Sequence, residues 1–220
     1  FAILRAVTVR TARLRSPVPP SGALGPLIGR EAELDAVDGW LSRNERLVTL
    51  CGSPGIGKTR LARAVQAAAE ARGWRTIFCD LTEATTEEDA VARLTTALAT
   101  AEALAVALAS LGDALVVLDN FEQLVETCRS SLREWLEAAT RARFLVTSRA
   151  LVGLPDERSV ELTPLALPAR GDLRSDAVDL FLERVRRTAF DYEPSASEAA
   201  AIAEITRRLD GIPLAIELAA

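Results

Sequence analysis

The sequence has 220 residues, of which 49% are hydrophobic and 26% are charged, and its formal net charge is −5. This composition excludes an intrinsically disordered chain and argues against nucleic-acid binding through bulk electrostatics. The sequence contains no histidine, which excludes histidine-based acid–base catalysis and histidine metal sites within it. It begins with Phe1 and contains no methionine, so we expect it to be an internal piece of a longer protein.

The first 26 residues precede the regular pattern of the rest. Residues 1–30 contain no acidic residue and five arginines, at positions 5, 10, 13, 15 and 30. Such a segment suits either an arm that faces nucleic acid or a solvated linker, and we favour the linker. Residues 16–26 support this choice, because a run rich in proline, glycine and serine has little capacity for helix or sheet. Residues 2–14 alternate partly and are compatible with a strand that either belongs to an upstream domain or packs back on this one.

Residues 27–165 alternate between strand and helix patterns. Apolar spacing predicts helices at residues 30–41, 59–72, 87–111 and 124–139, and apolar runs predict strands at residues 46–51, 74–81, 114–119, 143–148 and 160–162. Continuous apolar strands that alternate with helices are typical of a parallel sheet covered on both faces. We therefore predict an α/β domain at residues 27–165 with a five-stranded parallel sheet flanked by helices.

The pattern changes after residue 165. Helices are predicted at residues 176–190, 197–209 and 213–220, with no strand between them. We interpret residues 166–220 as a second, all-helical subdomain that is truncated by the end of the sequence.

Two features bear on the cellular compartment. The stretch 94–118 is rich in alanine and leucine, but Glu102, Gly112 and Asp113 interrupt it, so a packing helix followed by a buried strand is favoured over a membrane span. The three cysteines, Cys51, Cys79 and Cys128, form no C-x-x-C pair, and we interpret them as reduced core residues rather than as a disulfide. We expect a soluble, cytoplasmic protein without a membrane partner.

The residues 52–59, G-S-P-G-I-G-K-T, match the phosphate-loop pattern G-x-x-x-x-G-K-[ST] in full. They lie between a predicted strand and a predicted helix, as the mechanism requires, which argues against a chance match. The glycines at 52, 55 and 57 allow backbone amides to surround a phosphate, and the helix contributes its positive end. Lys58, the only lysine in the sequence, would contact the β- and γ-phosphates, and Thr59 would bind Mg²⁺.

Three further residues at strand ends are candidates for nucleotide chemistry. Asp119 follows the apolar run 115–118 and would hold Mg²⁺, although an aspartate there could simply cap the next helix. Glu122 is the nearest carboxylate that could orient a water, with a solvated helix-start residue as the equal alternative. Arg149 follows the next strand, whose carboxyl end should lie beside that of the Asp119 strand, and could contact the γ-phosphate; with 25 arginines in the sequence, an arginine without a functional role is the alternative.

The ordered set of motifs resembles the nucleotide-binding domain of the STAND-class, NB-ARC-like P-loop NTPases, above all the bacterial large ATP-binding transcriptional regulators. The matching segments are L-I-G-R-E-A-E-L at 27–34, the phosphate loop, L-D-N-F-E at 118–122, T-S-R at 147–149 and L-D-G-I-P-L-A-I-E-L-A at 209–219. The resemblance implies that Gly29 and Arg30 lie near the adenosine and that Gly211 and Pro213 pack on the base. Ile56 and Arg60 complete the predicted nucleotide-binding set, and Thr59 and Asp119 form the predicted metal set.

The predicted cofactors are ATP or ADP with Mg²⁺. An [NT]-K-x-D element for guanine cannot exist here, because Lys58 is the only lysine. Two positions depart from the family's pattern: Asn120 follows Asp119 where strongly hydrolysing relatives of the wider class carry glutamate, and Gln123 stands where the regulators often carry histidine. Both departures argue against fast turnover.

We predict an ATP/ADP-binding signal-transduction switch with slow ATP hydrolysis, forming part of a larger transcriptional or signalling regulator. The alternatives are an AAA+-like turnover ATPase and a non-enzymatic scaffold stabilised by nucleotide. The resemblance implies winged-helix and repeat domains elsewhere in the longer chain, self-association in the ATP state, and DNA contact only through regions outside this sequence.

Overall fold

The computed structural model describes residues 25–169 and 173–220 of the chain. It forms two compact units, which we call the sheet unit, Arg30–Leu162, and the helical unit, Thr163–Ala220 with the segment up to Gly29. The sequence placed its boundaries at 26/27 and 165/166, and that division into domains stays a prediction. The predicted strand at residues 2–14 and the predicted linker up to residue 24 lie outside the described residues.

The sheet unit contains the predicted five-stranded parallel sheet, with strand order β2-β3-β4-β1-β5. The strands are β1 Leu47–Cys51, β2 Arg75–Asp80, β3 Ala114–Asp119, β4 Arg143–Ser148 and β5 Arg158–Glu161. Every residue of β1, β3 and β4 is buried, which explains why these strands appear in the sequence as continuous apolar runs. The predicted fold class is therefore confirmed.

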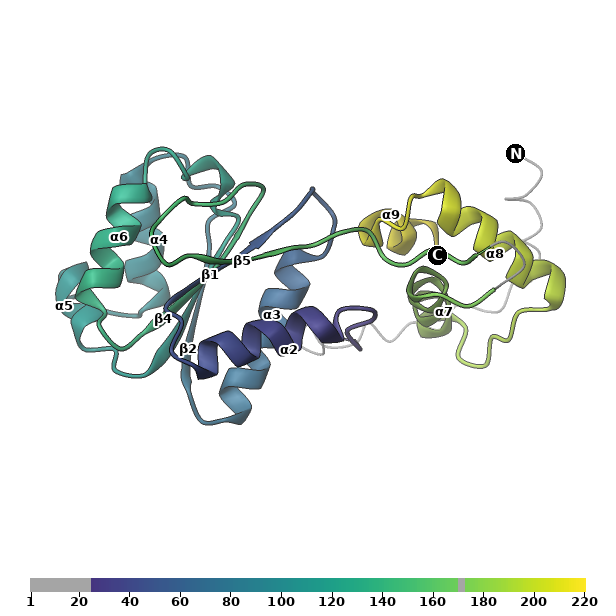
Figure 1. The fold of residues 1–220 in the computed structure, drawn as a ribbon, viewed down its shortest axis with the longest axis horizontal. Coiled ribbons are helices and arrows are strands. Elements are labelled where there is room, and N and C mark those ends of the chain that lie inside the picture. Colours follow the sequence, from purple (N-terminus) through teal and green to yellow (C-terminus); the bar gives the residue numbers. More distant parts are fainter. Residues whose placement is uncertain (1–24, 170–172) are drawn as a thin grey trace. The chain divides into compact units, whose positions relative to one another are not determined.

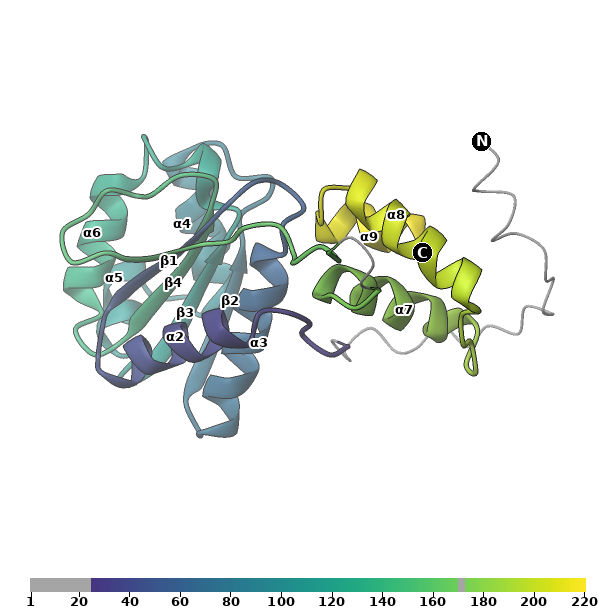
Figure 2. The same ribbon diagram turned by 45° about the vertical axis from the view of Figure 1, so that its right-hand side comes forward.

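Helices cover both faces of the sheet. The helices are α2 Glu31–Ser42, α3 Lys58–Ala71, α4 Glu87–Ala97, α5 Leu104–Ala109 and α6 Arg129–Ala138. Figures 1 and 2 show α2 and α3 on one face and α4, α5 and α6 on the other. Alternate strand residues such as Val116 and Phe144 pack against Leu94, Leu108 and Trp135 of the second helical layer. Because side chains alternate along a strand, the same strands supply both layers of the core.

Two predicted helices of this unit differ from the observed ones. The predicted helix 87–111 is two helices, since Ala99 adopts a left-handed backbone (φ 53°) and the chain turns between Ala97 and Leu104. The predicted helix 124–139 begins only at Arg129, because residues 124–128, which follow the short 3₁₀ turn η1 Phe121–Gln123, form turns. The apolar spacing of these segments reflects burial, which a turn and a helix can both provide.

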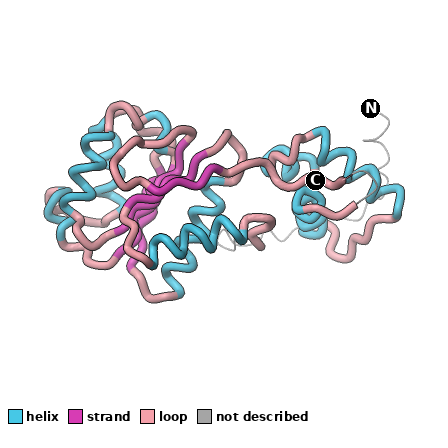
Figure 3. The backbone as a smooth tube through the Cα atoms, viewed as in Figure 1, coloured by secondary structure: helices cyan, strands magenta, loops and turns pink. Residues whose placement is uncertain are grey.

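The helical unit contains α7 Asp176–Thr188, α8 Ala196–Arg208 and α9 Pro213–Ala219, and Figure 3 shows no strand in the described part of this unit. Ser175 caps α7 by accepting the Val178 N–H, and Ser195 caps α8 in a capping box with Glu198. The three helices close over a core that includes Phe181, Ile202 and Ile216.

All three cysteines are buried and free, as the sequence predicts. Burial raises the pKa of Cys51 to about 11, so its thiol stays protonated at neutral pH. Among the helices of residues 25–169 and 173–220, none is long and apolar enough to cross a membrane.

Candidate functional site

The phosphate-loop segment connects the end of β1 to the start of α3, as the sequence predicts. Its glycines adopt positive φ angles of 151° at Gly52, 74° at Gly55 and 101° at Gly57. A Cβ atom at Gly52 would lie 2.9 Å from the carbonyl oxygen of Leu162, so only glycine fits there without a shift. The loop therefore turns tightly and brings its backbone to the amino end of α3.

Lys58 lies under this loop and is 8% exposed. Its ammonium donates to the carbonyl oxygens of Gly52 at 2.8 Å and Ser53 at 3.1 Å. Burial lowers the pKa of Lys58; the charges of Glu122 and Asp119 oppose this shift and the charge of Arg149 adds to it. The four predicted catalytic residues thus lie close enough to interact electrostatically.

Asp119, the last residue of β3, is 2% exposed and faces the start of α3. The Thr59 hydroxyl donates to Asp119 Oδ1 at 3.0 Å, which joins the two residues that the sequence assigns to Mg²⁺. Burial raises the pKa of Asp119, whereas the hydroxyls of Thr147 and Thr59 act in the opposite direction. Burying a carboxylate away from water costs free energy, and the two hydroxyl donors offset part of that cost at Asp119.

Glu122 and Arg149 form an ion pair at the same edge of the sheet. Arg149 Nε lies 3.1 Å from Glu122 Oε1, and the Glu122 side chain is 18% exposed while that of Arg149 is 61% exposed. Glu122 Oε2 is buried and has no hydrogen-bond partner within the described parts of the chain. A buried carboxylate oxygen without a donor is rare, so this atom marks a place where a water or ligand could bind.

The remaining predicted residues of the sheet unit adjoin the loop. Arg30 is buried, pairs with Glu33 at 2.9 Å and donates to the backbone oxygen of Ile56 at 3.5 Å. The Ile56 side chain is fully buried, so Ile56 faces any ligand only through its backbone. Arg60 lies half-buried in the first turn of α3.

Gly29, Gly211 and Pro213, which the resemblance assigns to the adenosine, belong to the helical unit. A Cβ atom at Gly29 would lie 2.6 Å from the Asp176 side chain, and one at Gly211 would overlap the Leu165 carbonyl oxygen. Pro213 occupies the first turn of α9. Packing and capping within the helical unit explain these three residues, and their contact with a nucleotide stays a prediction.

Two residues beside Asp119 were assigned no role from the sequence, although one of them, Thr147, lies in the matching T-S-R segment. Thr147 of β4 donates its hydroxyl to Asp119 Oδ1 at 2.6 Å. Asp80 ends β2 directly opposite Asp119 in the strand register, and it accepts hydrogen bonds from the backbone and hydroxyl of Thr82, which lower its pKa. The rule that identified Asp119, a polar residue at the carboxyl end of a buried strand, could have identified both.

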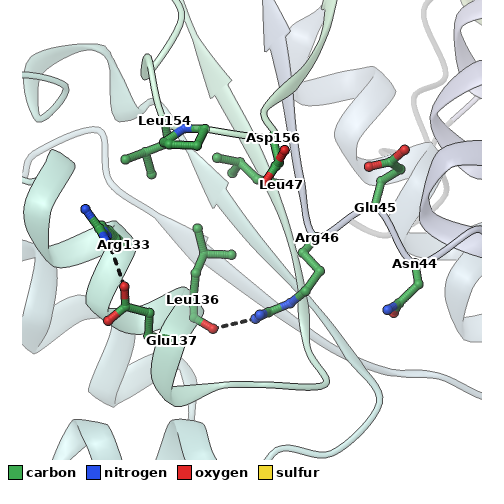
Figure 4. A pocket seen from close by; sticks show the side chains of 10 residues that line it. Asn44, Glu45, Arg46, Leu47, Arg133, Leu136, Glu137, Leu154 and Asp156 are labelled. Carbon is green, nitrogen blue, oxygen red and sulfur yellow. Dashed lines mark hydrogen bonds and ion pairs between the residues drawn. The ribbon is translucent and has the colours of Figure 1, made fainter.

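A separate cavity of about 470 Å³ lies at the opposite, amino end of the strands, and Figure 4 shows its lining. None of the predicted site residues lines it. Its walls come from the turn before β1, from α6 and from the loop between β4 and β5, and they are formed by Asn44, Glu45, Arg46, Leu47, Arg133, Leu136, Glu137, Leu154, Pro155 and Asp156.

Comparison with known proteins places this arrangement among ATPase domains. A family model described as "AAA ATPase domain" matches residues 26–212. An uncharacterized protein of Mycobacterium tuberculosis (strain ATCC 25618 / H37Rv) is 37% identical over 205 residues, which cover 90% of this chain and 50% of that protein. A second protein of that strain, which carries the name of an HTH-type transcriptional regulator, is 36% identical over 190 residues, covering 82% of this chain and 20% of that protein.

Among solved structures, AMPPCP-bound DnaA from Aquifex aeolicus superposes with a TM-score of 0.55 at 18% identity, covering 92% of this chain and 67% of DnaA. At this identity the likeness concerns the fold alone. The chain spans half the length of the first mycobacterial relative and a fifth of the second.

Proposed function

The chain belongs to the AAA ATPase domain family, and we propose that it is an ATP/ADP-binding switch of the STAND class, with slow ATP hydrolysis, within a longer regulatory protein. The observation that carries the proposal is the joint placement of Lys58 under a glycine loop and of Thr59 against Asp119 at 3.0 Å. A cation and a hydroxyl at the start of α3, facing a carboxylate at the end of β3, suit a polyphosphate with its metal ion.

The phosphate chain would be bound by the loop and by Lys58. Positive φ angles at Gly55 and Gly57 are compatible with backbone amides that converge on an anion at the start of α3. An ammonium carries three donors, so Lys58 can bind a phosphate oxygen beside its two carbonyl partners. Lys58 would thereby contribute the fixed positive charge of the site.

The residues present also fit Mg²⁺. This ion prefers oxygen ligands and is usually held by one or two carboxylates together with substrate phosphates. Thr59 and Asp119 supply a hydroxyl and a carboxylate within hydrogen-bond distance of each other. The described residues contain no group of three or more acidic, cysteine or histidine side chains that could hold a metal by themselves, so phosphate oxygens would complete the set. Bound Mg²⁺ would neutralise charge on the phosphates.

Arg149 would distinguish ATP from ADP. Its guanidinium is largely exposed and uses Nε to contact Glu122, while a guanidinium has five N–H donors in all. Only ATP offers a γ-phosphate to the remaining donors. A ligand shifts a conformational equilibrium only through different affinity for its states, so a γ-phosphate contact of this kind is what a switch requires. Adenosine contacts by Gly29, Arg30, Gly211 and Pro213 remain part of this proposal through the resemblance.

The relatives support a regulatory context. One of them is named as an HTH-type transcriptional regulator, and the chain covers only a fifth of its length. We therefore propose that DNA contact and signal sensing belong to other domains of a longer, cytoplasmic chain, including the winged-helix and repeat domains expected from the resemblance.

A turnover ATPase is the second candidate, and the family assignment itself favours it. The AMPPCP-bound DnaA structure shares the fold with this chain. Against rapid turnover, Asn120 follows Asp119, and its amide donates to Thr82 rather than supplying a second carboxylate. A scaffold that binds nucleotide permanently would show neither turnover nor exchange.

The affinities of the purified chain for ADP and for AMPPCP test the proposal, measured calorimetrically with Mg²⁺. We expect unequal affinities for the two nucleotides, and a loss of about 10- to 100-fold for both in Lys58→Ala, the range of a charged hydrogen bond. Arg149→Met should lose the difference between the nucleotides while still binding ADP. Equal affinities in the unsubstituted chain would sink the switch, and rapid hydrolysis would favour the turnover ATPase.

A further inference from the structure

Thr147 is fully buried in β4, two residues before Arg149, and its hydroxyl makes two short contacts. It donates to Asp119 Oδ1 at 2.6 Å and accepts the backbone N–H of Asn120 at 2.9 Å. The amide can only donate, so the single hydroxyl proton of Thr147 is directed at the carboxylate. The polarity of this pair of hydrogen bonds is therefore fixed by the backbone.

These two bonds connect two parts of the candidate site. Asn120 has a left-handed backbone (φ 64°) and starts the η1 turn that carries Glu122. Asp119 Oδ1 receives the hydroxyls of Thr147 and Thr59, whereas Oδ2 receives the Asn120 side-chain amide at a longer 3.4 Å. With Oδ1 held from two sides, rotation of the carboxylate is restricted and Oδ2 has capacity for a further partner.

We propose that Thr147 is a positioning residue: its hydroxyl holds the Asp119 carboxylate in the orientation that binds Mg²⁺ with nucleotide, and ties the η1 turn to the same point. The proposal rests on the proposed function, since it concerns how the assigned metal residue is held. It predicts that removal of the hydroxyl weakens the Mg²⁺-dependent part of nucleotide binding and spares the part that Lys58 and the loop provide.

The same sheet offers a matched control. Thr49 lies in the adjacent strand β1 and is also fully buried, but its hydroxyl has no hydrogen-bond partner in the described residues. Thr49→Val and Thr147→Val make the same chemical change in neighbouring strands. Only the second removes a contact with the site.

The experiment measures ADP affinity with and without Mg²⁺, together with the melting temperature of the ligand-free chain. We expect the ratio of ADP affinities with and without Mg²⁺ to fall roughly tenfold in Thr147→Val, which is the scale of one hydrogen bond to a charged group. Binding of ADP without the metal should not change. Thr147→Ser, which keeps the hydroxyl, should restore the Mg²⁺ effect, and Thr49→Val should not alter it.

Several outcomes would overturn the proposal. An unchanged Mg²⁺ effect in Thr147→Val, or a serine variant no better than the valine variant, would show that the hydroxyl does not position the carboxylate. If Thr147→Val and Thr147→Ala both fail to fold while Thr147→Ser folds, the hydroxyl serves folding alone. If the unsubstituted chain binds ADP and Mg²⁺ has no effect on it, the positioning role falls while nucleotide binding stands; if it binds no nucleotide, both fall.

Discussion

The two ends of the parallel sheet use charged residues in opposite ways. At the carboxyl end, Lys58, Asp119 and Glu122 lie close together in partly or fully buried positions, and Glu122 Oε2 lacks a partner in the described residues. At the amino end, Arg46 and Arg143 donate to backbone carbonyls at helix ends. The charges at the amino end therefore hold the fold together, whereas we propose that those at the carboxyl end serve a ligand.

The two arginines at the amino end of the sheet donate to carbonyl oxygens at the carboxyl ends of helices. Arg46 donates to the carbonyl oxygens of Leu136 at 2.5 Å and Ala139 at 2.7 Å, in the last turn of α6, and Figure 4 shows the first of these contacts. Arg143 donates to the Leu41 carbonyl at 2.8 Å near the end of α2 and stacks on the Trp74 ring at 4.3 Å. The last carbonyls of a helix have no partner within the helix. A cation there donates hydrogen bonds to them and interacts favourably with the negative end of the helix dipole.

Chain direction explains the contrast. All five strands run parallel, so the intervening helices return in the opposite direction. Helix ends with free carbonyls therefore collect at the amino edge of the sheet, and helix starts with free amides collect at the carboxyl edge. An arginine at the first edge meets an acceptor, whereas a phosphate at the second edge would meet donors.

The largest expected effect on stability comes from a substitution that disturbs the glycine loop at the carboxyl end of the sheet. In Gly52→Ala the new Cβ atom would combine a φ of 151° with a contact of 2.9 Å to the Leu162 carbonyl, and we expect a loss of about 2–4 kcal/mol in the free energy of unfolding. Gly57→Ala has an unfavourable φ of 101° but nothing within 4 Å of the new atom, so its loss should be smaller. Urea denaturation of both variants measures the difference. Equal losses would mean that the carbonyl contact is relieved easily.

The next prediction concerns the amino end. Arg46→Ala removes the donors to two carbonyls of the last turn of α6, and we expect it to cost about 1–3 kcal/mol, the penalty for buried polar groups left without partners. Nucleotide affinity should not change, because Arg46 lies at the opposite edge of the sheet. Arg43→Ala, an exposed arginine nearby, serves as the control in urea denaturation. A variant of Arg46 that weakens nucleotide binding without loss of stability would contradict the structural role.

The sequence predicted the sheet and the residues of the carboxyl end because both rest on local rules. Buried parallel strands appear as apolar runs, and the glycine loop is constrained by backbone geometry within a few residues. Asp119 and Arg149 were found because the carboxyl ends of neighbouring parallel strands meet at one edge.

Features that depend on distant partners were not predictable in the same way. The left-handed backbone of Asn120 starts the η1 turn after β3, and its amide is held by Thr147, 27 residues away in the chain. The burial of Arg30 against the Ile56 carbonyl depends on how α2 packs beside the loop. The helix-end contacts of the arginines at the amino end were not predicted, because their carbonyl partners lie as far as 102 residues away in the chain.

The smallest expected effect is a change in unfolding temperature when a carboxylate at either end of the sheet, Asp119 or Asp113, is replaced by an amide. Burial raises the pKa of Asp119 above its ordinary value, which means that the folded state favours the protonated form. A group of this kind contributes stability below its unfolded pKa and loses that contribution as pH rises through its folded pKa. At neutral pH the ionised Asp119 therefore costs stability, and Asp119→Asn should unfold at a slightly higher temperature than the unsubstituted chain while losing the Mg²⁺ effect on nucleotide binding.

Thermal unfolding between pH 4 and pH 8 tests whether Asp119→Asn raises or lowers the unfolding temperature. The advantage of Asp119→Asn should shrink as the pH falls, because protonation removes the cost from the unsubstituted chain. Asp113→Asn provides the opposite case at the amino end, where Asp113 pairs with Arg141 and with Arg143 at 3.6 Å, so its loss should slightly lower the unfolding temperature, within the roughly 0–1 kcal/mol of a surface ion pair. If both variants were destabilised at neutral pH, Asp119 would be a structural carboxylate like Asp113. Stabilisation of the Asp119 variant alone would indicate that the carboxylate is retained for the ligand, at some cost to the fold.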